Sequence, residues 1–143
     1  MYKNILVATD GSKLSGKAVA HAIGLAKPLG AKLTAFYAAP DYPLPMYADG
    51  VVYEPVSKKE YAALANQEAE KILSAIAQKA EAGGLECATI HTIAPAPWEA
   101  ILAAAPPSFA LAGLSMGGYV ALEIIRQSPQ RVSRLCLLDT RAA

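Results

Sequence analysis

The residue types from which metal sites, disulfides and acid–base catalysts are most often built are scarce in this sequence. Its 143 residues include only two histidines, His21 and His91, and two cysteines, Cys87 and Cys136. The cysteines fall on separate predicted strands, and we read both as reduced core residues. Two distant histidines and two separated cysteines do not make a metal site, so no metal is expected. The net charge is +1 without a basic stretch, which excludes nucleic acid as an expected partner.

Long apolar runs are also missing. The longest are far shorter than the ~20 residues that span a bilayer, and residues 1–12 lack the apolar region of a signal peptide. We therefore expect no membrane association and a cytoplasmic location. Hydrophobic residues make up 54% of the chain and charged residues 17%, which is typical of a packed globular protein. The length suits one domain with its own core, so we predict a single α/β domain over residues 1–143.

Short apolar strands alternate with helices along the chain. This alternation predicts right-handed crossovers and a parallel sheet with helices on both faces. The fold class is therefore a three-layer α/β sandwich, Rossmann-like or flavodoxin-like, with one five-stranded sheet. Ser57 and Glu60 form a capping box at the start of the second helix, and Leu64 is placed on the core face of that helix. Strands are expected at residues 4–9, 32–39, 85–93, 109–114 and 134–138, helices at 15–29, 57–82, 97–104 and 117–127, and a Pro-rich loop at 40–55.

Residues 1–104 resemble a universal stress protein. The resemblance implies a five-stranded parallel sheet of order 3-2-1-4-5, frequent dimerisation and, in many members, ATP binding. It places Asp10 and Gly11 beside the nucleotide and the backbone around Ala38 and Ala39 against the adenine. Asp10 also has a plainer interpretation, as a cap of the helix that follows it. The segments that carry the resemblance are YKNILVATDGS with Ser15, the strand KLTAFYA, the Pro-rich loop and the capped helix ending in AGG.

The phosphate-binding part of that family pattern is incomplete. ATP-binding members carry a glycine motif after the fourth strand, of the form G-x2-G-x9-G-S/T, whose amides hold the phosphates. No glycine follows Gly118 in this chain, so the second half of the motif is absent. The sequence therefore predicts no tightly bound cofactor and at most weak binding of ATP or another nucleotide.

Residues 106–141 resemble a different family. Their sequence, PPSFALAGLSMGGYVALEIIRQSPQRVSRLCLLDT, is similar to the strand, nucleophile elbow, helix and next strand of an α/β-hydrolase, with GLSMG matching G-x-S-x-G. The resemblance makes Ser115 the nucleophile and the Met116 amide half of the oxyanion hole. We interpret the chain as an engineered chimera of a stress-protein part, residues 1–105, and a hydrolase part, residues 106–143. A natural fusion or a truncated gene is the alternative.

Ser115 lacks a base that could activate it. In the predicted strand order His91 lies three strands from the serine, roughly 14 Å away, and His21 is predicted to face outward from the first helix. A serine without a base is a poor nucleophile, so we expect no enzymatic turnover and regard Ser115 and Met116 as vestigial. The same order puts Asp10 and Ser115 at the ends of neighbouring strands, so any binding or residual chemistry is expected in the crevice between them.

Three functional hypotheses follow. The leading one is a folded chimera with no evolved activity that keeps a vestigial nucleotide-binding crevice. The alternatives are a nucleotide-binding stress-type protein and a weak serine esterase that uses Ser115. The last predicted strand, taken with the aspartate that follows it as Arg134–Asp139, has no later strand to cover its edge. Free strand edges pair with other chains, so we predict a homodimer through this edge.

Overall fold

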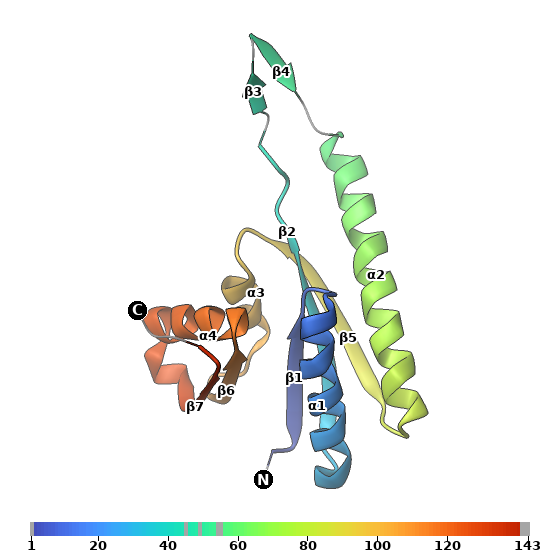
Figure 1. The fold of residues 1–143 in the computed structure, drawn as a ribbon, viewed down its shortest axis with the longest axis vertical. Coiled ribbons are helices and arrows are strands. Elements are labelled where there is room, and N and C mark those ends of the chain that lie inside the picture. The colour runs from blue at the N-terminus through green and yellow to red at the C-terminus, as the bar shows by residue number, and fades with distance from the viewer. Residues whose placement is uncertain (1, 45, 49, 54–55, 141–143) are drawn as a thin grey trace. The chain divides into compact units, whose positions relative to one another are not determined.

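The computed structural model describes residues 2–44, 46–48, 50–53 and 56–140, and the chain divides into two compact units, Met1–Ala94 and Pro95–Ala143. We call them the N-terminal and C-terminal units. The N-terminal unit contains β1 (Asn4–Thr9), α1 (Lys13–Leu29), β2 (Lys32–Pro40), β3 (Met46–Ala48), β4 (Val51–Tyr53), α2 (Lys58–Ala82) and β5 (Cys87–Ala94), and the C-terminal unit contains α3 (Pro97–Ala104), β6 (Phe109–Leu114), α4 (Met116–Gln127), a short 3-10 helix (Pro129–Arg131) and β7 (Val132–Leu138) (Figure 1).

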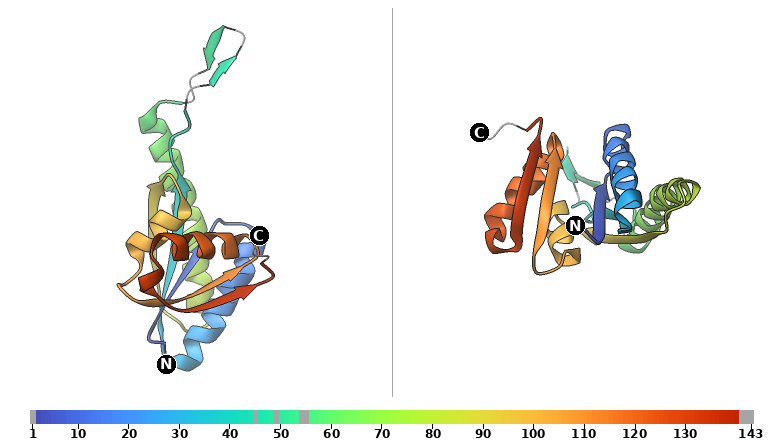
Figure 2. Two further views of the ribbon diagram at one scale, coloured as in Figure 1. Left: turned by 90° about the vertical axis from the view of Figure 1, so that its left-hand side faces the viewer. Right: turned by 90° about the horizontal axis from the view of Figure 1, so that it is seen from below.

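The parallel sheet of the N-terminal unit has the order β1-β2-β5, with β2 in the centre. Its strands are short runs of apolar and β-branched residues, which fit a pleated surface that other elements cover. The helices α1 and α2 both cover one face of this sheet (Figure 2). The core between them is formed by buried residues of β1, β2, both helices and the turn before β2: Val7, Val19, Ala26, Ala31, Leu33, Ala35, Leu73, Ile76 and Ala80.

Both long helices have ends that satisfy their free backbone groups. At the start of α1 the Ser12 side chain accepts a hydrogen bond from the Ser15 amide, and at its end Gly30 is left-handed, with φ of 59°. The helix α2 begins with the predicted capping box, in which Ser57 and Glu60 bond each other's backbone amides. Among the described residues, no helix has the length and apolarity needed to cross a membrane.

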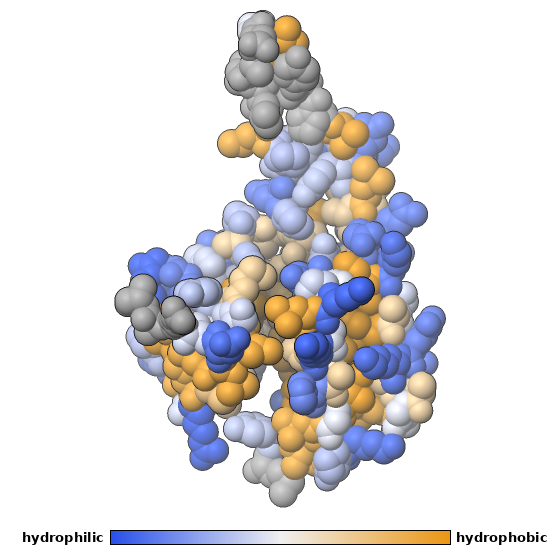
Figure 3. All heavy atoms as spheres, viewed as in Figure 1, coloured by the Kyte–Doolittle hydropathy of each residue, from blue (hydrophilic) through white to orange (hydrophobic). Residues whose placement is uncertain are grey.

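The predicted burial of one residue on the core face of α2 is wrong. The sequence places Leu64 on the core face of α2, but its side chain is 56% exposed, whereas Leu73 and Ile76 are buried. The first turns of α2 extend beyond the sheet (Figure 1), so a side chain there has no strand beneath it. Leu44 and Val56 are exposed as well, and Figure 3 shows apolar surface around the start of α2.

The predicted Pro-rich loop at residues 40–55 contains a short antiparallel hairpin of β3 and β4. Gly50 lies in its turn with φ of 73°, and Asp-Gly is a frequent turn pair in hairpins. Asp49 itself falls outside the described residues. The prediction of a plain loop is therefore wrong. Each hairpin strand has only three residues, which are too few to show the alternating pattern from which a strand is predicted.

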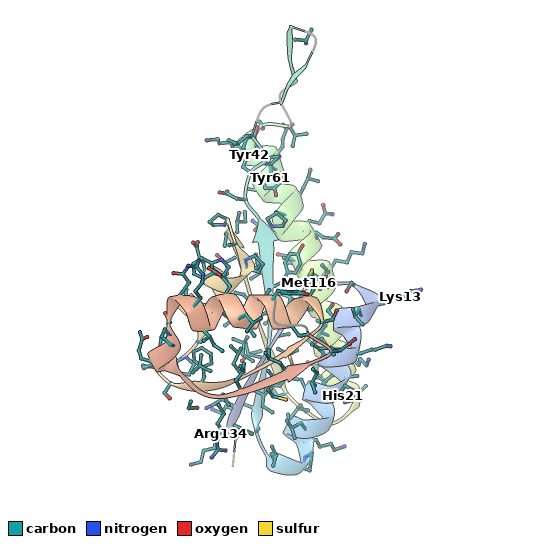
Figure 4. All side chains as sticks on the ribbon, turned by 60° about the vertical axis from the view of Figure 1, so that its left-hand side comes forward. Lys13, His21, Tyr42, Tyr61, Met116 and Arg134 are labelled. Atoms are coloured by element: carbon teal, nitrogen blue, oxygen red, sulfur yellow. The ribbon has the colours of Figure 1, made fainter. Side chains whose placement is uncertain are left out.

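Two tyrosines hold the base of this hairpin segment at the start of α2. The Tyr42 hydroxyl donates to the Val56 carbonyl at 2.9 Å, and the Tyr61 hydroxyl donates to the Pro40 carbonyl at 2.8 Å. The two rings meet edge to face, with centroids 5.5 Å apart, and the Lys58 ammonium lies over the Tyr42 ring. Figure 4 shows the two tyrosine side chains together at this point. Both ends of the segment are therefore fastened to the N-terminal unit.

The C-terminal unit consists of the parallel pair β6 and β7 with α4 packed on it. Ile124 of α4 is completely buried. The Arg131 guanidinium donates to the Ala105 and Pro106 carbonyls at 2.6 and 2.8 Å, and it lies 5.6 Å from the centre of the Phe109 ring. These contacts fix the segment that leads into β6.

The predicted single sheet of order 3-2-1-4-5 is not matched. The ladders of the described residues form a three-stranded sheet, β1-β2-β5, a two-stranded sheet, β6-β7, and the β3-β4 hairpin. The predicted neighbours within each part are present, since the predicted order 3-2-1 corresponds to β5-β2-β1 and the predicted pair 4-5 to β6-β7. The pairing of β1 with β6 that would join the two parts is absent from these ladders. Apolar patterning identifies strands, but it carries little information on which distant strands pair, and residues 95–143 pack mainly among themselves.

Candidate functional site

The turn that follows β1 brings together the polar residues of the predicted nucleotide site. The Asp10 carboxylate accepts a hydrogen bond from the Ser12 amide at 2.9 Å, and Ser12, rather than Asp10, is the N-cap of α1. The pKa of Asp10 lies below its ordinary value because the Ser15 hydroxyl, the Ser12 hydroxyl and the Ser12 amide stabilise the charged form. Asp10 is therefore an exposed, ionised carboxylate at neutral pH.

The backbone of this turn passes close to α2. Gly11 has φ of +78°, and a Cβ at this position would lie 2.8 Å from Ile72 Cδ1. Hydroxyl groups hold the turn from the other side, since Thr9 Oγ1 and Ser15 Oγ are 2.8 Å apart and the Ser12 hydroxyl reaches Ser15 Oγ at 3.3 Å. The positive φ favours glycine at position 11, and the hydrogen bond from the Ser12 amide holds the Asp10 carboxylate in the turn.

Ala38 and Ala39 lie at the same edge of the N-terminal sheet as Asp10. The ladder between β1 and β2 ends at the pair Thr9 and Tyr37, so Asp10 and Ala38 each follow the last pair by one residue. β2 continues beyond it, with Ala38 and Ala39 paired to β5 alone. The backbone edge of these two residues that faces β1 therefore has no strand partner among the described residues. All four residues predicted for the nucleotide site fall at this one edge.

An open pocket of about 420 Å³ between α1 and α2 adjoins the Asp10 turn. Its walls are mostly apolar, and three charged side chains of α2 border it. Sequence patterns do not predict this pocket, because the spacing of two helices depends on packing, which no local pattern encodes. The residues that line it are Thr9, Gly11, Ser12, Gly16, Val19, Glu68, Lys71, Ile72, Ala75, Ile76 and Lys79.

None of the histidines and cysteines belongs to the Asp10 turn or to the Ala38 and Ala39 segment. His91 of β5 bonds the Asn66 side chain of α2 at 3.2 Å, and His21 is exposed on α1. Cys87 is half-buried, and burial raises the pKa of its thiol. The prediction that both cysteines are core residues is wrong for Cys136, which is exposed on β7. Within the part of the chain that the structure describes, no three metal-ligating side chains cluster.

Ser115 forms the predicted sharp corner in the C-terminal unit. It is the only residue between β6 and α4, and its φ of 51° and ψ of −117° are strained for a residue with a side chain. The Ser115 amide donates to the Leu138 carbonyl, and the Gly118 amide donates to the Ser115 carbonyl, both at 2.9 Å. A connection of one residue, with these amides engaged internally, leaves no loop that could surround phosphates.

The C-terminal unit offers Ser115 no histidine as a base. No histidine occurs between residues 95 and 143. Met116, predicted to supply an oxyanion amide, is the first residue of α4 and is 63% exposed. The Thr140 hydroxyl donates to the Ser115 carbonyl at 3.2 Å and so supports the corner. Asp10 and Ser115 belong to different units, and the crevice predicted between them stays a prediction.

Comparisons with known proteins agree with the fold and with the first resemblance. The model of the family described as "Universal stress protein family" matches residues 1–106. A protein of the universal stress protein family from Burkholderia pseudomallei, known from its crystal structure, is 21% identical over 96% of this chain and 96% of its own, with a TM-score of 0.72. A universal stress protein crystallised in complex with cAMP is 20% identical over 96% of this chain and 97% of its own, with a TM-score of 0.53.

No curated protein matches the sequence. At these identities the two structures establish a shared α/β fold and nothing further. The family match is the stronger finding because it spans the strand, turn and helix around Asp10 and most of the chain beyond them. It confirms the resemblance of the N-terminal part, and the chain belongs to the universal stress protein family.

Proposed function

We propose that this chain is a weak nucleotide-binding protein whose site is the edge formed by the Asp10 turn and by Ala38 and Ala39. The observation that carries the proposal is the early end of the β1-β2 ladder: beyond Tyr37, β2 pairs with β5 alone, so the backbone N–H and C=O groups that β2 points toward β1 have no strand partner among the described residues. A universal stress protein of similar fold was crystallised with cAMP, and that protein's ligand supports a nucleotide here.

Each part of this edge suits a different part of a nucleotide. The free N–H and C=O groups of an extended strand can bond the donor and acceptor atoms on the edge of a base. The ionised Asp10 carboxylate accepts hydrogen bonds only, and ribose hydroxyls are donors of the matching kind. Phosphates gain little at this edge, because the ionised Asp10 carboxylate carries a charge of the same sign as theirs. We therefore expect base and ribose to dominate binding, so that ATP and cAMP bind with similar, weak affinity.

Calorimetric titration of the full chain with ATP and with cAMP tests this proposal. Asp10→Asn is expected to weaken binding of either nucleotide at least about tenfold, because a charged hydrogen bond of this kind contributes about 1.5–3 kcal/mol. Glu70→Gln is the matched control, since it removes one exposed carboxylate of α2 and should leave the affinity unchanged. Undetectable binding by the unaltered chain, or equal affinity after Asp10→Asn, would contradict the proposal.

We also propose that the C-terminal part descends from an α/β-hydrolase and has lost its catalytic function. The conformation of Ser115 supports this origin, since its positive φ is what a nucleophile elbow requires. The family match ends at residue 106, beside the predicted join at residues 105 and 106. Within this proposal the corner is retained for its shape, because it turns β6 directly into α4.

Hydrolysis of an activated p-nitrophenyl ester separates this proposal from the esterase alternative. The unaltered chain and Ser115→Ala are expected to hydrolyse the ester at the same slow rate, because no histidine lies in the C-terminal unit to accept the serine proton. A burst of p-nitrophenol, or a rate that depends on Ser115, would instead establish a working nucleophile.

A further inference from the structure

The end of β2 that carries the proposed nucleotide edge is held at three places. Along one side, Ala38, Ala39 and Pro40 pair with β5. Ala39 is also 1% exposed. Its side chain points to the face that α1 and α2 cover, because side chains alternate along a strand and Tyr37, two residues earlier, packs against the core on that face. The third support lies at the end of the strand, where the chain passes into the hairpin segment.

Tyr61 of α2 supplies the support at the end of the strand. Its hydroxyl lies 2.8 Å from the Pro40 carbonyl and 3.1 Å from the Asp41 carbonyl, so one donor is shared by the last residue of β2 and the residue after it. A proline restricts the residue before it to extended backbone, and here that residue is Ala39. Pro40 therefore sets the backbone shape of Ala39, and the Tyr61 hydroxyl fixes where this extended backbone ends.

Tyr42 makes a similar contact with the other end of the hairpin segment. Its hydroxyl donates to the Val56 carbonyl at 2.9 Å, and Val56 lies just before α2, not on β2. Both tyrosines are half-buried, and their rings pack edge to face at the start of α2 (Figure 4). The two hydroxyl groups therefore share their surroundings, but only that of Tyr61 bonds the end of β2.

A backbone edge binds a ligand best when it is already held in its bound shape, because the cost of ordering it is subtracted from the binding free energy. Segments with few anchors open locally more readily than the centre of a sheet. We propose that Tyr61 is a positioning residue of the nucleotide site, whose hydroxyl holds the end of β2 in the extended form that presents Ala38 and Ala39 to the base. This role rests on the proposed function, and Tyr61 acts in it through the backbone of β2.

Calorimetric titration of the full chain and of two matched phenylalanine variants with ATP tests this role. Tyr61→Phe keeps the ring and removes the hydroxyl. It is expected to weaken ATP binding about fivefold, because the apparent affinity falls with the fraction of molecules whose binding edge is in place, and one hydrogen bond shifts that fraction by about this factor. Tyr42→Phe removes a hydroxyl of the same kind and should leave the affinity unchanged.

The outcomes of this titration separate the role of Tyr61 from the nucleotide site itself. If the unaltered chain binds ATP and Tyr61→Phe binds it equally well, or if both variants lose the same affinity, the role of Tyr61 is overturned and the site stands. If the unaltered chain does not bind ATP, the site is overturned and the role of Tyr61 with it.

Hydrogen exchange followed by mass spectrometry distinguishes positioning from a general loss of stability. Without nucleotide, Tyr61→Phe is expected to speed amide exchange at residues 38–41 at least about threefold and to leave exchange in α1 and at the centre of β2 unchanged. Tyr42→Phe should not change exchange at residues 38–41. An equal rise throughout the N-terminal unit, or no rise at residues 38–41, would overturn the proposal.

Discussion

Replacing Gly113 with alanine is expected to lower the free energy of unfolding of the C-terminal unit by about 3 kcal/mol. Gly113 is buried at the end of β6, and a Cβ there would meet the Gly117 carbonyl and lie 2.7 Å from Gly118 Cα. Both contacts are with backbone, which cannot rotate away as a side chain can. Either β6 or the start of α4 must move, and the tight Ser115 corner between them leaves little freedom to do so.

Tryptophan fluorescence during urea unfolding measures this effect, because the only tryptophan, Trp98, lies in the C-terminal unit. Gly117→Ala is the matched control, since a Cβ on Gly117 would have no atom within 4 Å. Alanine is also the better helix former at that position, so the control should be neutral or slightly stabilising. Equal stability of the two variants would mean that the corner is looser than its contacts indicate.

Leu33→Ala is expected to cost the N-terminal unit about 3 kcal/mol, within the range measured for leucine truncations in protein cores. Leu33 lies on the central strand, is 1% exposed and belongs to the core beneath α1 and α2. Its removal leaves a cavity that strand, sheet and helices are too constrained to fill. Urea unfolding followed by far-UV circular dichroism, which reports mainly on the helices, measures the loss.

Leu64→Ala provides the control for that measurement. The chemical change is the same, but Leu64 is 56% exposed at the start of α2. Its truncation therefore loses little hydrophobic transfer free energy and creates no cavity. We expect a change in stability within about 0.5 kcal/mol. If both leucine variants lost the same stability, the core would not lie where the burial of the side chains places it.

The parts of the fold that follow from short stretches of sequence are predicted well. The capping box of Ser57 and Glu60 marks the start of α2 because its hydrogen bonds join residues only three positions apart. The corner at Ser115 is predictable for the same reason, since small residues must surround a strand that turns at once into a helix. Each of these features is decided within about one helical turn, where the sequence carries most of its structural information.

What depends on distant contacts is not predictable in this way. The exposure of Leu64 depends on how far α2 extends past the sheet, and the exposure of Cys136 depends on what packs on its face of β7. At the candidate site, strand ends alone predict that Asp10 and Ala38 share one edge. The side of Ala38 and Ala39 that faces β1 has no strand partner among the described residues because the β1-β2 ladder stops before these residues. The folded sheet shows where this ladder stops, and the sequence does not.

The bond between the Tyr42 hydroxyl and the Val56 carbonyl has a consequence for how the chain can vary. Residues 42 and 56 meet within hydrogen-bond reach, so the segment between them begins and ends at one point of the N-terminal unit. The entropy of closing such a segment changes only slowly with its length. Insertions, deletions or grafted peptides between these two residues should therefore be tolerated, which makes this point of the unit a place where new recognition can be added without disturbing the sheet.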